Sequence, residues 1–494
     1  MKLSNNKSYI LFFIGAYVIF FLAISRNLFT PYLWYDEAGQ FWIAKGLNHD
    51  SEPMTPEKGV LEVIENNKYY NLDPGGFGIL LHYWTFISNH HVWLRMLPFF
   101  FFIGVVISFI YLSFVWTRNI NVAILMGFIP ILSPKLLYMA FEIRAYSMEC
   151  LGTVIGIIAL ENLNTRITYR KLLLWSCVFS FFMTSRYSEI LILYIVSIYV
   201  LYLITKSELT LAQKVLSILL YSLPLLVTLA YVYFFALVFQ NNDLLELYYL
   251  PYLSKDISIL VEPQNILALL CIALLIRLFY QKHKYPLIEK YQSLVFVTVL
   301  SNILFIILSF LGKHPWSLSN FRCISLIMLF TICFVSFCGE VILKVFEKST
   351  DIAYNLSYVM VFFSFYSTSD NLFIRNRLTY NVFYNKYIYD NFTVLNTSKY
   401  DKIFVEYGEG PFIKYLYEYG KLSAQKKKVY PNKFTFQKGT VHSIGREVKK
   451  FTDVTINKLL EFDLIIMPSE AIRSRCPECR YKLVHGTKNF FERY

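Results

Sequence analysis

Long apolar runs constrain what this chain can fold into more than any other feature of its sequence. Runs long enough to cross about 30 Å of hydrocarbon recur from residue 9 to residue 367 and then stop. Hydrophobic residues make up 56% of the 494 residues and charged residues only 16%, whereas about a quarter of the residues in a typical soluble protein are charged. The pattern predicts an α-helical polytopic membrane protein.

The apolar runs divide the chain into two predicted parts. Residues 1–367 would form a transmembrane core, and the polar residues 368–494 would form a C-terminal soluble α/β domain. Within that domain, 402–406 and 463–467 have the apolar character of buried strands, and 411–419 is predicted to be a helix with proline in its first turn.

We expect about eleven transmembrane helices in the core. The predicted spans are 9–25, 94–116, 120–138, 145–160, 172–184, 188–205, 214–238, 264–280, 292–311, 321–339 and 353–367. The first span could be taken for a signal peptide, but the residues at its end form a weak cleavage site, so we expect it to be retained. The apolar stretch 77–87 is short for a span and is expected to lie along the outer interface; a shallow re-entrant span there would change the count by one.

The charges of the connections predict which side of the membrane each one faces. Lysine and arginine gather in alternate short connections, which marks these as cytoplasmic by the positive-inside rule. The opposite set contains the first loop 26–93, the segments 239–263 and 312–320, and the C-terminal domain, so these parts would be extracytoplasmic. We therefore expect a multi-pass protein of the cell membrane, in the inner membrane if the cell is Gram-negative.

The predicted cytoplasmic connections are too short to fold a nucleotide-binding domain, because each βαβ unit needs about 30 residues or more. The sequence has neither a G-x-x-x-x-G-K-[ST] nor a G-x-G-x-x-G motif. Activated substrate must therefore arrive by another route, and for an outward-facing enzyme a membrane-embedded lipid carrier is the natural one. No cofactor and no nucleic-acid partner is predicted.

Two adjacent carboxylates follow the first span on the predicted outer side. Asp36 and Glu37 could supply a catalytic general base, because burial near lipid raises a carboxyl pKa toward a useful range. The alternative is a solvated acidic pair that begins a helix.

Further along the same loop, Asp73 lies in a Pro-Gly turn. It would contribute to substrate binding if this turn folds over the site, and would otherwise belong to a plain turn.

Further charged and aromatic residues gather at the outer ends of several predicted spans. The candidate substrate-binding residues are Glu142, Arg144, Tyr146, Arg186, Tyr187, Lys313, His314 and Arg322. The last three of these could be cations. Cations that converge with carboxylates on one face suit an anionic lipid headgroup, and arginine binds phosphate through its bidentate fork. The alternative is that the arginines only snorkel to lipid headgroups.

No metal site is predicted. Asp36, Glu37 and His314 could gather around a divalent ion, but no His-x-x-x-His pattern and no carboxylate-rich loop supports one. Cys476 and Cys479 form a single C-x-x-C, which outside the cytoplasm is expected to be a local disulfide rather than a metal or redox site.

Several short motifs follow one another on the predicted outer side. They are Trp34 followed by Asp36-Glu37, Asp73-Pro74 before an aromatic interfacial helix, Leu94-Arg95-Met96-Leu97-Pro98 at the start of the next span, and Arg144-Ala145-Tyr146. Together they resemble the GT-C glycosyltransferases, in the branch of the protein O-mannosyltransferases and the lipid A aminoarabinose transferases. The resemblance follows the order of elements through about residue 340. The sequence departs from the common His-Pro-Pro turn of these families by having Leu72-Asp73-Pro74-Gly75.

The resemblance implies an inverting glycosyltransferase that moves a sugar from a polyprenyl-phosphate donor to a hydroxyl of a glycan, lipid or protein. It makes Asp36 the acidic residue that acts on the acceptor, with Glu37 beside it, and places Arg144 and Arg322 where family members have cations. Two alternatives stay open. One is an oligosaccharyltransferase-like or polymerase-like enzyme that uses a pyrophosphate-linked glycan. The other is a lipid or glycan transporter, which would need ionisable residues or broken helices near the bilayer midplane.

Overall fold

The structure of the chain is a computed structural model. The residues that it describes are 2–47, 57–240, 252–280, 289–349, 352–353, 355, 357–359, 361, 403–405, 410–419, 434–436, 463–466, 481–483 and 490–493. Cys476 and Cys479 lie outside the described residues, as does most of the predicted span 353–367, so these two predictions stay predictions.

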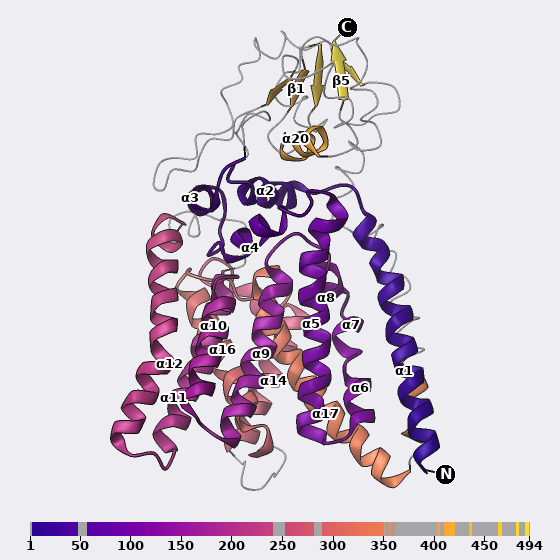
Figure 1. Cartoon of the computed structure of the whole chain (residues 1–494), viewed down its shortest axis with the longest axis vertical. Helices are drawn as coiled ribbons and strands as arrows, with labels where there is room; N and C mark the ends of the chain where they lie inside the picture. Colours follow the sequence, from indigo (N-terminus) through magenta and orange to yellow (C-terminus); the bar gives the residue numbers. More distant parts are fainter. Residues whose placement is uncertain are drawn as a thin grey trace. The chain divides into compact units, whose positions relative to one another are not determined.

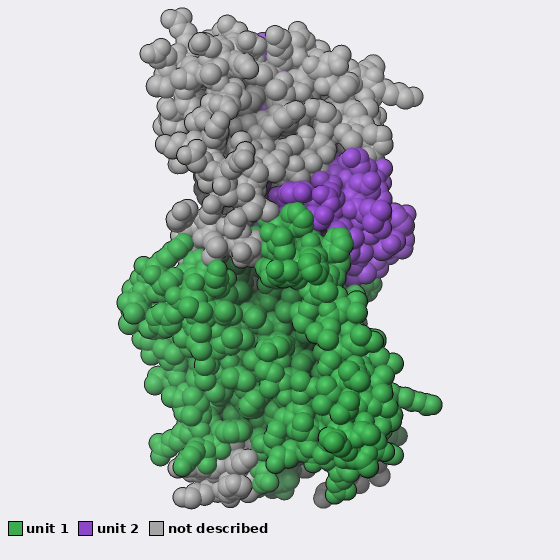
Figure 2. Space-filling view, turned by 90° about the vertical axis from the view of Figure 1, so that its left-hand side faces the viewer, with its two compact units in different colours: residues 1–25, 98–373 green, residues 26–97, 374–494 purple. Residues whose placement is uncertain are grey.

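The chain divides into two compact units that do not follow the order of the sequence. Unit 1 contains residues 1–25 and 98–373, and unit 2 contains residues 26–97 and 374–494 (Figure 2). The first long loop therefore belongs to the same unit as the C-terminal segment. The predicted domain boundary after residue 367 stays a prediction.

Unit 1 is a bundle of helices, many of them long (Figure 1). They are α1 (Lys2–Ile24), α5 (His91–Thr117, whose first turns belong to unit 2), α6 (Ile120–Met126), α7 (Ile129–Leu132), α8 (Pro134–Met139), α9 (Tyr146–Thr165), α10 (Tyr169–Met183), α11 (Tyr187–Lys206), α12 (Leu211–Val232), α14 (Pro263–Tyr280), α16 (Gln292–Phe310) and α17 (Ile324–Lys348), with the shorter turns η2 (Tyr233–Leu237), η3 (Ile257–Val261) and η5 (Phe321–Cys323). Helix α9 packs against α10, α11 and α17, α10 against α12, and α14 against α16.

Seven helices in the described part of the chain are long and apolar enough to cross a membrane. They are Lys7–Phe29, His91–Thr117, Tyr187–Lys206, Leu211–Gln240, Pro263–Tyr280, Gln292–Phe310 and Ile324–Lys348. Each coincides with a predicted span, which confirms the α-helical multi-pass architecture. The predicted spans 145–160 and 172–184 are also helical, as α9 and α10. The total of eleven spans stays a prediction.

The predicted span 120–138 is divided into the three short helices α6, α7 and α8. Asn119 caps α6, because its Oδ1 accepts a hydrogen bond from the backbone N–H of Asn121 at 3.0 Å. Pro130 and Pro134 lie in the first turns of α7 and α8, where a missing N–H costs no helical hydrogen bond. The two prolines therefore interrupt what the hydrophobicity alone indicates to be one span.

Alternate connections of unit 1 meet at opposite ends of its helices. At the start of α16, Ser293 donates a hydrogen bond to Glu161, near the end of α9, at 3.0 Å. Beyond the end of α16, the carbonyl of Ser319 accepts a hydrogen bond from Lys135 on α8 at 3.2 Å. The helices thus run up and down, as the predicted alternation of connections requires.

Unit 2 contains three short helices that pack on one another: α2 (Tyr35–Ala44), α3 (Val60–Tyr70) and α4 (Gly76–Trp84). Helix α4 is the expected short helix of the stretch 77–87. It is preceded by Gly75 in the left-handed region at φ 96°, which glycine adopts at little cost. A Cβ on Gly75 would also lie 2.8 Å from the Asn67 amide nitrogen, so a side chain there would have to displace Asn67.

A mixed five-stranded sheet in unit 2 has the strand order β2-β1-β3-β5-β4. The strands are β1 (Ile403–Val405), β2 (Phe434–Phe436), β3 (Leu464–Ile466), β4 (Tyr481–Leu483) and β5 (Phe490–Arg493). The pairs β1–β2 and β1–β3 are parallel, while β3–β5 and β4–β5 are antiparallel. Helix α20 (Gly410–Glu418) follows β1 along the chain. The predicted strands at 402–406 and 463–467 and the helix at 411–419 are thereby confirmed.

The predicted orientation in the membrane can be tested with two exposed positions of unit 1. In a cysteine-free background, Ser254→Cys should react with an impermeant thiol reagent in intact cells, and Glu208→Cys should react only after permeabilisation. Both side chains are exposed, so a failure to react reports the membrane barrier. The reverse labelling pattern would contradict the predicted extracytoplasmic placement of the candidate site.

Candidate active site

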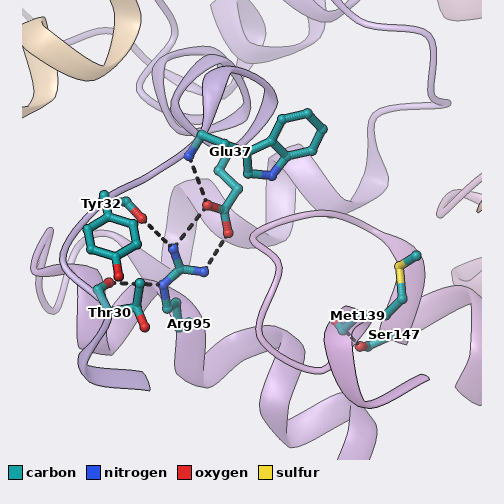
Figure 3. Close-up of polar contacts among 7 residues, drawn as sticks. Thr30, Tyr32, Glu37, Arg95, Met139 and Ser147 are labelled. Carbon is teal, nitrogen blue, oxygen red and sulfur yellow. Dashed lines mark hydrogen bonds and ion pairs between the residues drawn. The ribbon is translucent and has the colours of Figure 1, made fainter. Parts of the chain in front are cut away.

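The two adjacent acids of the first loop have different surroundings. Glu37 is buried in the first turn of α2, and its carboxylate receives both ends of the Arg95 fork, at 2.5 Å for Nη1–Oε1 and 3.0 Å for Nη2–Oε2 (Figure 3). The backbone N–H of Trp34 donates to the same carboxylate at 3.1 Å, which satisfies an unpaired donor at the helix N-terminus. Glu37 therefore joins the start of α2 to the start of α5.

Arg95 is also held by the segment that leads into α2. Its Nε donates to the carbonyl of Thr30 at 3.3 Å, and its Nη2 donates to the carbonyl of Tyr32 at 2.8 Å (Figure 3). A buried charge is tolerated when it is paired and its donors are satisfied. The guanidinium thus fixes the path of the chain between the first span and α2.

Asp36 lies beside Glu37 but is half-buried rather than buried. In the first turn of α2, its negative charge is favoured by the partial positive charge of the helix N-terminus. Because Glu37 is held by Arg95, Asp36 is the acid of the pair that retains access to solvent. The structure thereby separates two side chains that the sequence places together.

Asp73 is buried in the turn before α4. Its carbonyl accepts a hydrogen bond from the Asn67 amide at 2.8 Å, and Asn67 in turn accepts one from Asn71 at 3.0 Å. Asn71 also donates to the Gln40 side chain at 3.2 Å. These contacts fix the turn against α2 and α3, within unit 2. They support the structural interpretation of this turn.

In unit 1, Arg186 is held between α9 and α11. Its Nε lies 3.0 Å from Oε2 of Glu149, an ion pair in which both side chains are buried. Its guanidinium carbon lies 4.3 Å from the centroid of the Tyr146 ring, a cation–π contact. Ser188 donates to the other carboxylate oxygen of Glu149 at 2.5 Å. The structure therefore brings together Tyr146 and Arg186, two of the predicted binding residues.

Glu149 was not among the residues predicted from the sequence, and Glu189 lies beside it. Both are fully buried in the first turns of α9 and α11, and Glu189 accepts a hydrogen bond from Thr153 at 2.7 Å. Gly152 makes room for this acid, because a Cβ there would lie 2.6 Å from its Oε1. An ionisable residue inside an apolar run was the signal that could have identified Glu149.

Other predicted binding residues surround the ends of the same helices. Arg144 is half-buried in the turn between α8 and α9, and Glu142 beside it is buried. Close to them, Ser147 donates to the carbonyl of Met139 at 2.7 Å and closes this turn (Figure 3). Tyr187 donates to Gln240 at 2.8 Å, so its hydroxyl links the start of α11 to the residues that follow η2.

The surroundings of His314 favour a neutral ring over a cation. Its Nδ1 lies 2.8 Å from the carbonyl of Pro315 and therefore carries the proton, while Phe305 packs edge-on against the ring at 4.7 Å between centroids. Although part of the residue is exposed, enclosure of the ring lowers the pKa of His314 to about 4, and the charges of Arg322 and Arg186 act in the same direction. The two arginines therefore lie near this ring, and they remain the cations of this region, together with the exposed Lys313.

The two units thus offer different chemistry. In unit 2, Asp36 on α2 retains access to solvent, and in unit 1 Arg186 is held by the buried Glu149 and the Tyr146 ring. Among the described residues, no group of three or more His, Cys, Asp or Glu side chains is arranged to hold a metal ion. A carboxylate can accept a proton, and oriented guanidinium groups can bind phosphate oxygens.

The ion pair of Glu37 predicts a large effect on stability. In Glu37→Gln the Arg95 guanidinium would lose its buried counter-charge, which typically costs about 3–5 kcal/mol. We expect a markedly lower unfolding temperature and yield in detergent. Asp36→Asn is the matched control and should unfold near the wild-type temperature. Equal stability of the two variants would contradict the distinction between these acids.

The lowered pKa of His314 predicts a dependence of stability on pH. Between pH 6.5 and about 4 the unfolded chain takes up a proton at this position and the folded chain does not, so acidification favours unfolding. We expect the unfolding temperature to fall more steeply from pH 7 to pH 4 in the wild type than in His314→Asn. Asparagine does not titrate and can still donate to the carbonyl of Pro315. Superimposable profiles would show that this ring is not held neutral.

Comparison with known proteins finds a similar fold but no match by sequence. No protein-family model and no curated protein matches the chain. The crystal structure of ArnT from Cupriavidus metallidurans in the apo state is similar at a TM-score of 0.57 and 8% identity, over 99% of this chain and 98% of that chain. The structure of the same protein bound to undecaprenyl phosphate is similar at a TM-score of 0.57 and 10% identity, over 98% and 97% of the two chains. The chain therefore has a fold similar to that of ArnT.

Proposed function

We propose that this protein is a membrane glycosyltransferase that moves a sugar from a polyprenyl-phosphate donor to an acceptor hydroxyl. The observation that carries the proposal is the likeness of fold over nearly the whole chain to ArnT, one structure of which is bound to undecaprenyl phosphate. Two functions that such a reaction needs are assigned to residues on the contacts that each has within its own unit. These are a base for the acceptor and cations for the phosphate.

The donor phosphate is assigned to the arginines of unit 1. Arg186 is oriented by the Glu149 carboxylate and the Tyr146 ring, so little side-chain entropy is lost when it binds an anion. Arg144 and Arg322 are the further cations that we assign to this phosphate. An oriented guanidinium costs no reorganisation as negative charge develops on the leaving phosphate.

The acceptor is assigned to Asp36. Its carboxylate takes the proton of the acceptor hydroxyl while the hydroxyl oxygen forms a bond to the anomeric carbon. The bond from that carbon to the phosphate oxygen breaks on the opposite side, and polyprenyl phosphate leaves with the electron pair. One displacement inverts the configuration at the anomeric carbon. Glu37 positions α2 through Arg95 and takes no proton.

The basic connections support a reaction on the extracytoplasmic face, since they predict that the first loop lies on that side. A lipid carrier can present a sugar there without a nucleotide-binding domain. The acceptor is a hydroxyl of a glycan, a lipid or a protein. We place the reaction in the cell membrane.

The donor is tested with purified protein in detergent. We expect transfer from a polyprenyl-phosphate sugar to a hydroxyl acceptor, and no transfer from a nucleotide sugar alone. The same preparation should bind undecaprenyl phosphate. Transfer from the nucleotide sugar, or failure to bind the lipid phosphate, would contradict the proposal.

Substitutions of Asp36 and of Arg186 should have different effects on turnover and donor binding in the same assay. Asp36→Asn keeps the size of the side chain but cannot accept a proton, so turnover should fall by about 10²–10⁴-fold while donor binding survives. Arg186→Ala should weaken donor binding as well as slow the reaction. Arg186→Lys should restore only part of the binding, because an ammonium cannot reproduce a bidentate fork. Normal turnover of Asp36→Asn would refute the assignment of the base.

A further inference from the structure

A helix from the C-terminal segment packs directly on the helix that carries Asp36. Both α20 and α2 belong to unit 2. All side chains of α20 from Pro411 to Leu416 are buried, so this helix is enclosed rather than placed on a surface. The proposed mechanism gives α20 no role so far.

Helix α20 contacts α2 and the segment just before α5. The Glu37 ion pair with Arg95 joins α2 to the start of α5. The indole N–H of Trp42, on α2, donates to the carbonyl of Pro411 at 2.8 Å. The Tyr415 ring packs edge-on against the Phe41 ring, with centroids 5.1 Å apart at 83°. The hydroxyl of Tyr415 donates to the carbonyl of Asn89 at 2.9 Å, just before α5 begins.

The residue after α20 makes a second set of contacts at the other end of α2. Tyr419 donates to Glu57, and Lys45, which caps the end of α2, pairs with the same carboxylate at 2.8 Å. Lys45 also lies 5.7 Å from the centroid of the Tyr419 ring. Partial burial alone would raise the pKa of Glu57, but the hydrogen bonds from Lys45 and Tyr419 hold it below its ordinary value. The carboxylate is therefore charged at neutral pH.

We propose that α20 is a positioning element of the reaction, which fixes α2 so that Asp36 meets the acceptor hydroxyl in a productive geometry. The inference rests on the proposed function of Asp36. It assigns to the C-terminal segment a part in turnover, through Trp42, Tyr415 and Tyr419. A displacement of about 1 Å in a reacting group can cost about 10²-fold in rate, so loosening α2 by a small amount is enough to be measured.

Two substitutions remove these hydrogen bonds and keep an aromatic ring at each position, although phenylalanine is smaller than tryptophan. Tyr415→Phe removes the hydrogen bond to Asn89, and Trp42→Phe removes the hydrogen bond to Pro411. In the double variant of the full chain we expect the turnover number to fall by about 10-fold. The dissociation constant for undecaprenyl phosphate should stay within about 2-fold of the wild type, because the arginines assigned to the phosphate belong to unit 1. Tyr221→Phe is the matched control, since Tyr221 is buried and donates one hydrogen bond to Ser197 within unit 1, at 3.0 Å.

The outcomes separate this inference from the proposed function. Turnover in the double variant equal to that of Tyr221→Phe would overturn the inference. A parallel loss of lipid binding, or activity that follows only the amount of folded protein in thermal unfolding, would also overturn it, because α20 would then act on folding alone. If the wild type transfers no sugar from polyprenyl phosphate, or Asp36→Asn is fully active, the proposed function fails instead. A selective loss of turnover with normal lipid binding and normal unfolding supports the positioning role.

Discussion

Hydrocarbon offers no hydrogen-bond partner to a polypeptide backbone, and the rest of this structure depends on that constraint. A spanning segment must satisfy its own N–H and C=O groups, so it becomes a helix. The described elements of unit 1 are accordingly helical. Arg186 and His314 lie at the end of a helix and in a connection between helices. The hydrocarbon of the bilayer therefore limits the places along the chain where a reactive polar side chain can lie.

Buried ion pairs then determine which charged side chains remain available for proton transfer or for binding a substrate. A charge taken out of water must be paired, and its remaining hydrogen bonds must be satisfied. Glu37 meets this requirement through Arg95, and Glu149 meets it through Arg186 and Ser188. In the first case the pair commits the carboxylate to holding α2, while Asp36 beside it stays half-exposed. In the second case the carboxylate holds an arginine in a fixed orientation between α9 and α11. The same interaction thus fixes a helix in one unit and orients, in the other, the arginine that we propose binds the donor phosphate.

Unit 2 is built from two segments that lie at opposite ends of the chain. The first loop contributes α2, α3 and α4, and the C-terminal segment contributes α20 and the sheet. Buried aromatic rings and the hydrogen bond from Trp42 to Pro411 join them. A helix as short as α2 has little stability of its own in water, so its position depends on such tertiary contacts. The C-terminal segment is therefore part of the framework around the candidate base.

The sequence by itself determined the helical multi-pass architecture, the location of the acid pair and the strands at 402–406 and 463–467, because each of these leaves a local pattern of apolar and charged residues. It also pointed to Arg144, Tyr146 and Arg186, whose charge or aromatic character stands out at the ends of apolar runs. Only the tertiary structure decided that Glu37 is paired with Arg95, that His314 is neutral, and that α20 packs on α2. Each of these depends on side chains that are far apart in the sequence, or on enclosure by neighbouring rings. No local pattern encodes such contacts, and the burial that they create sets the charge and accessibility of the groups concerned.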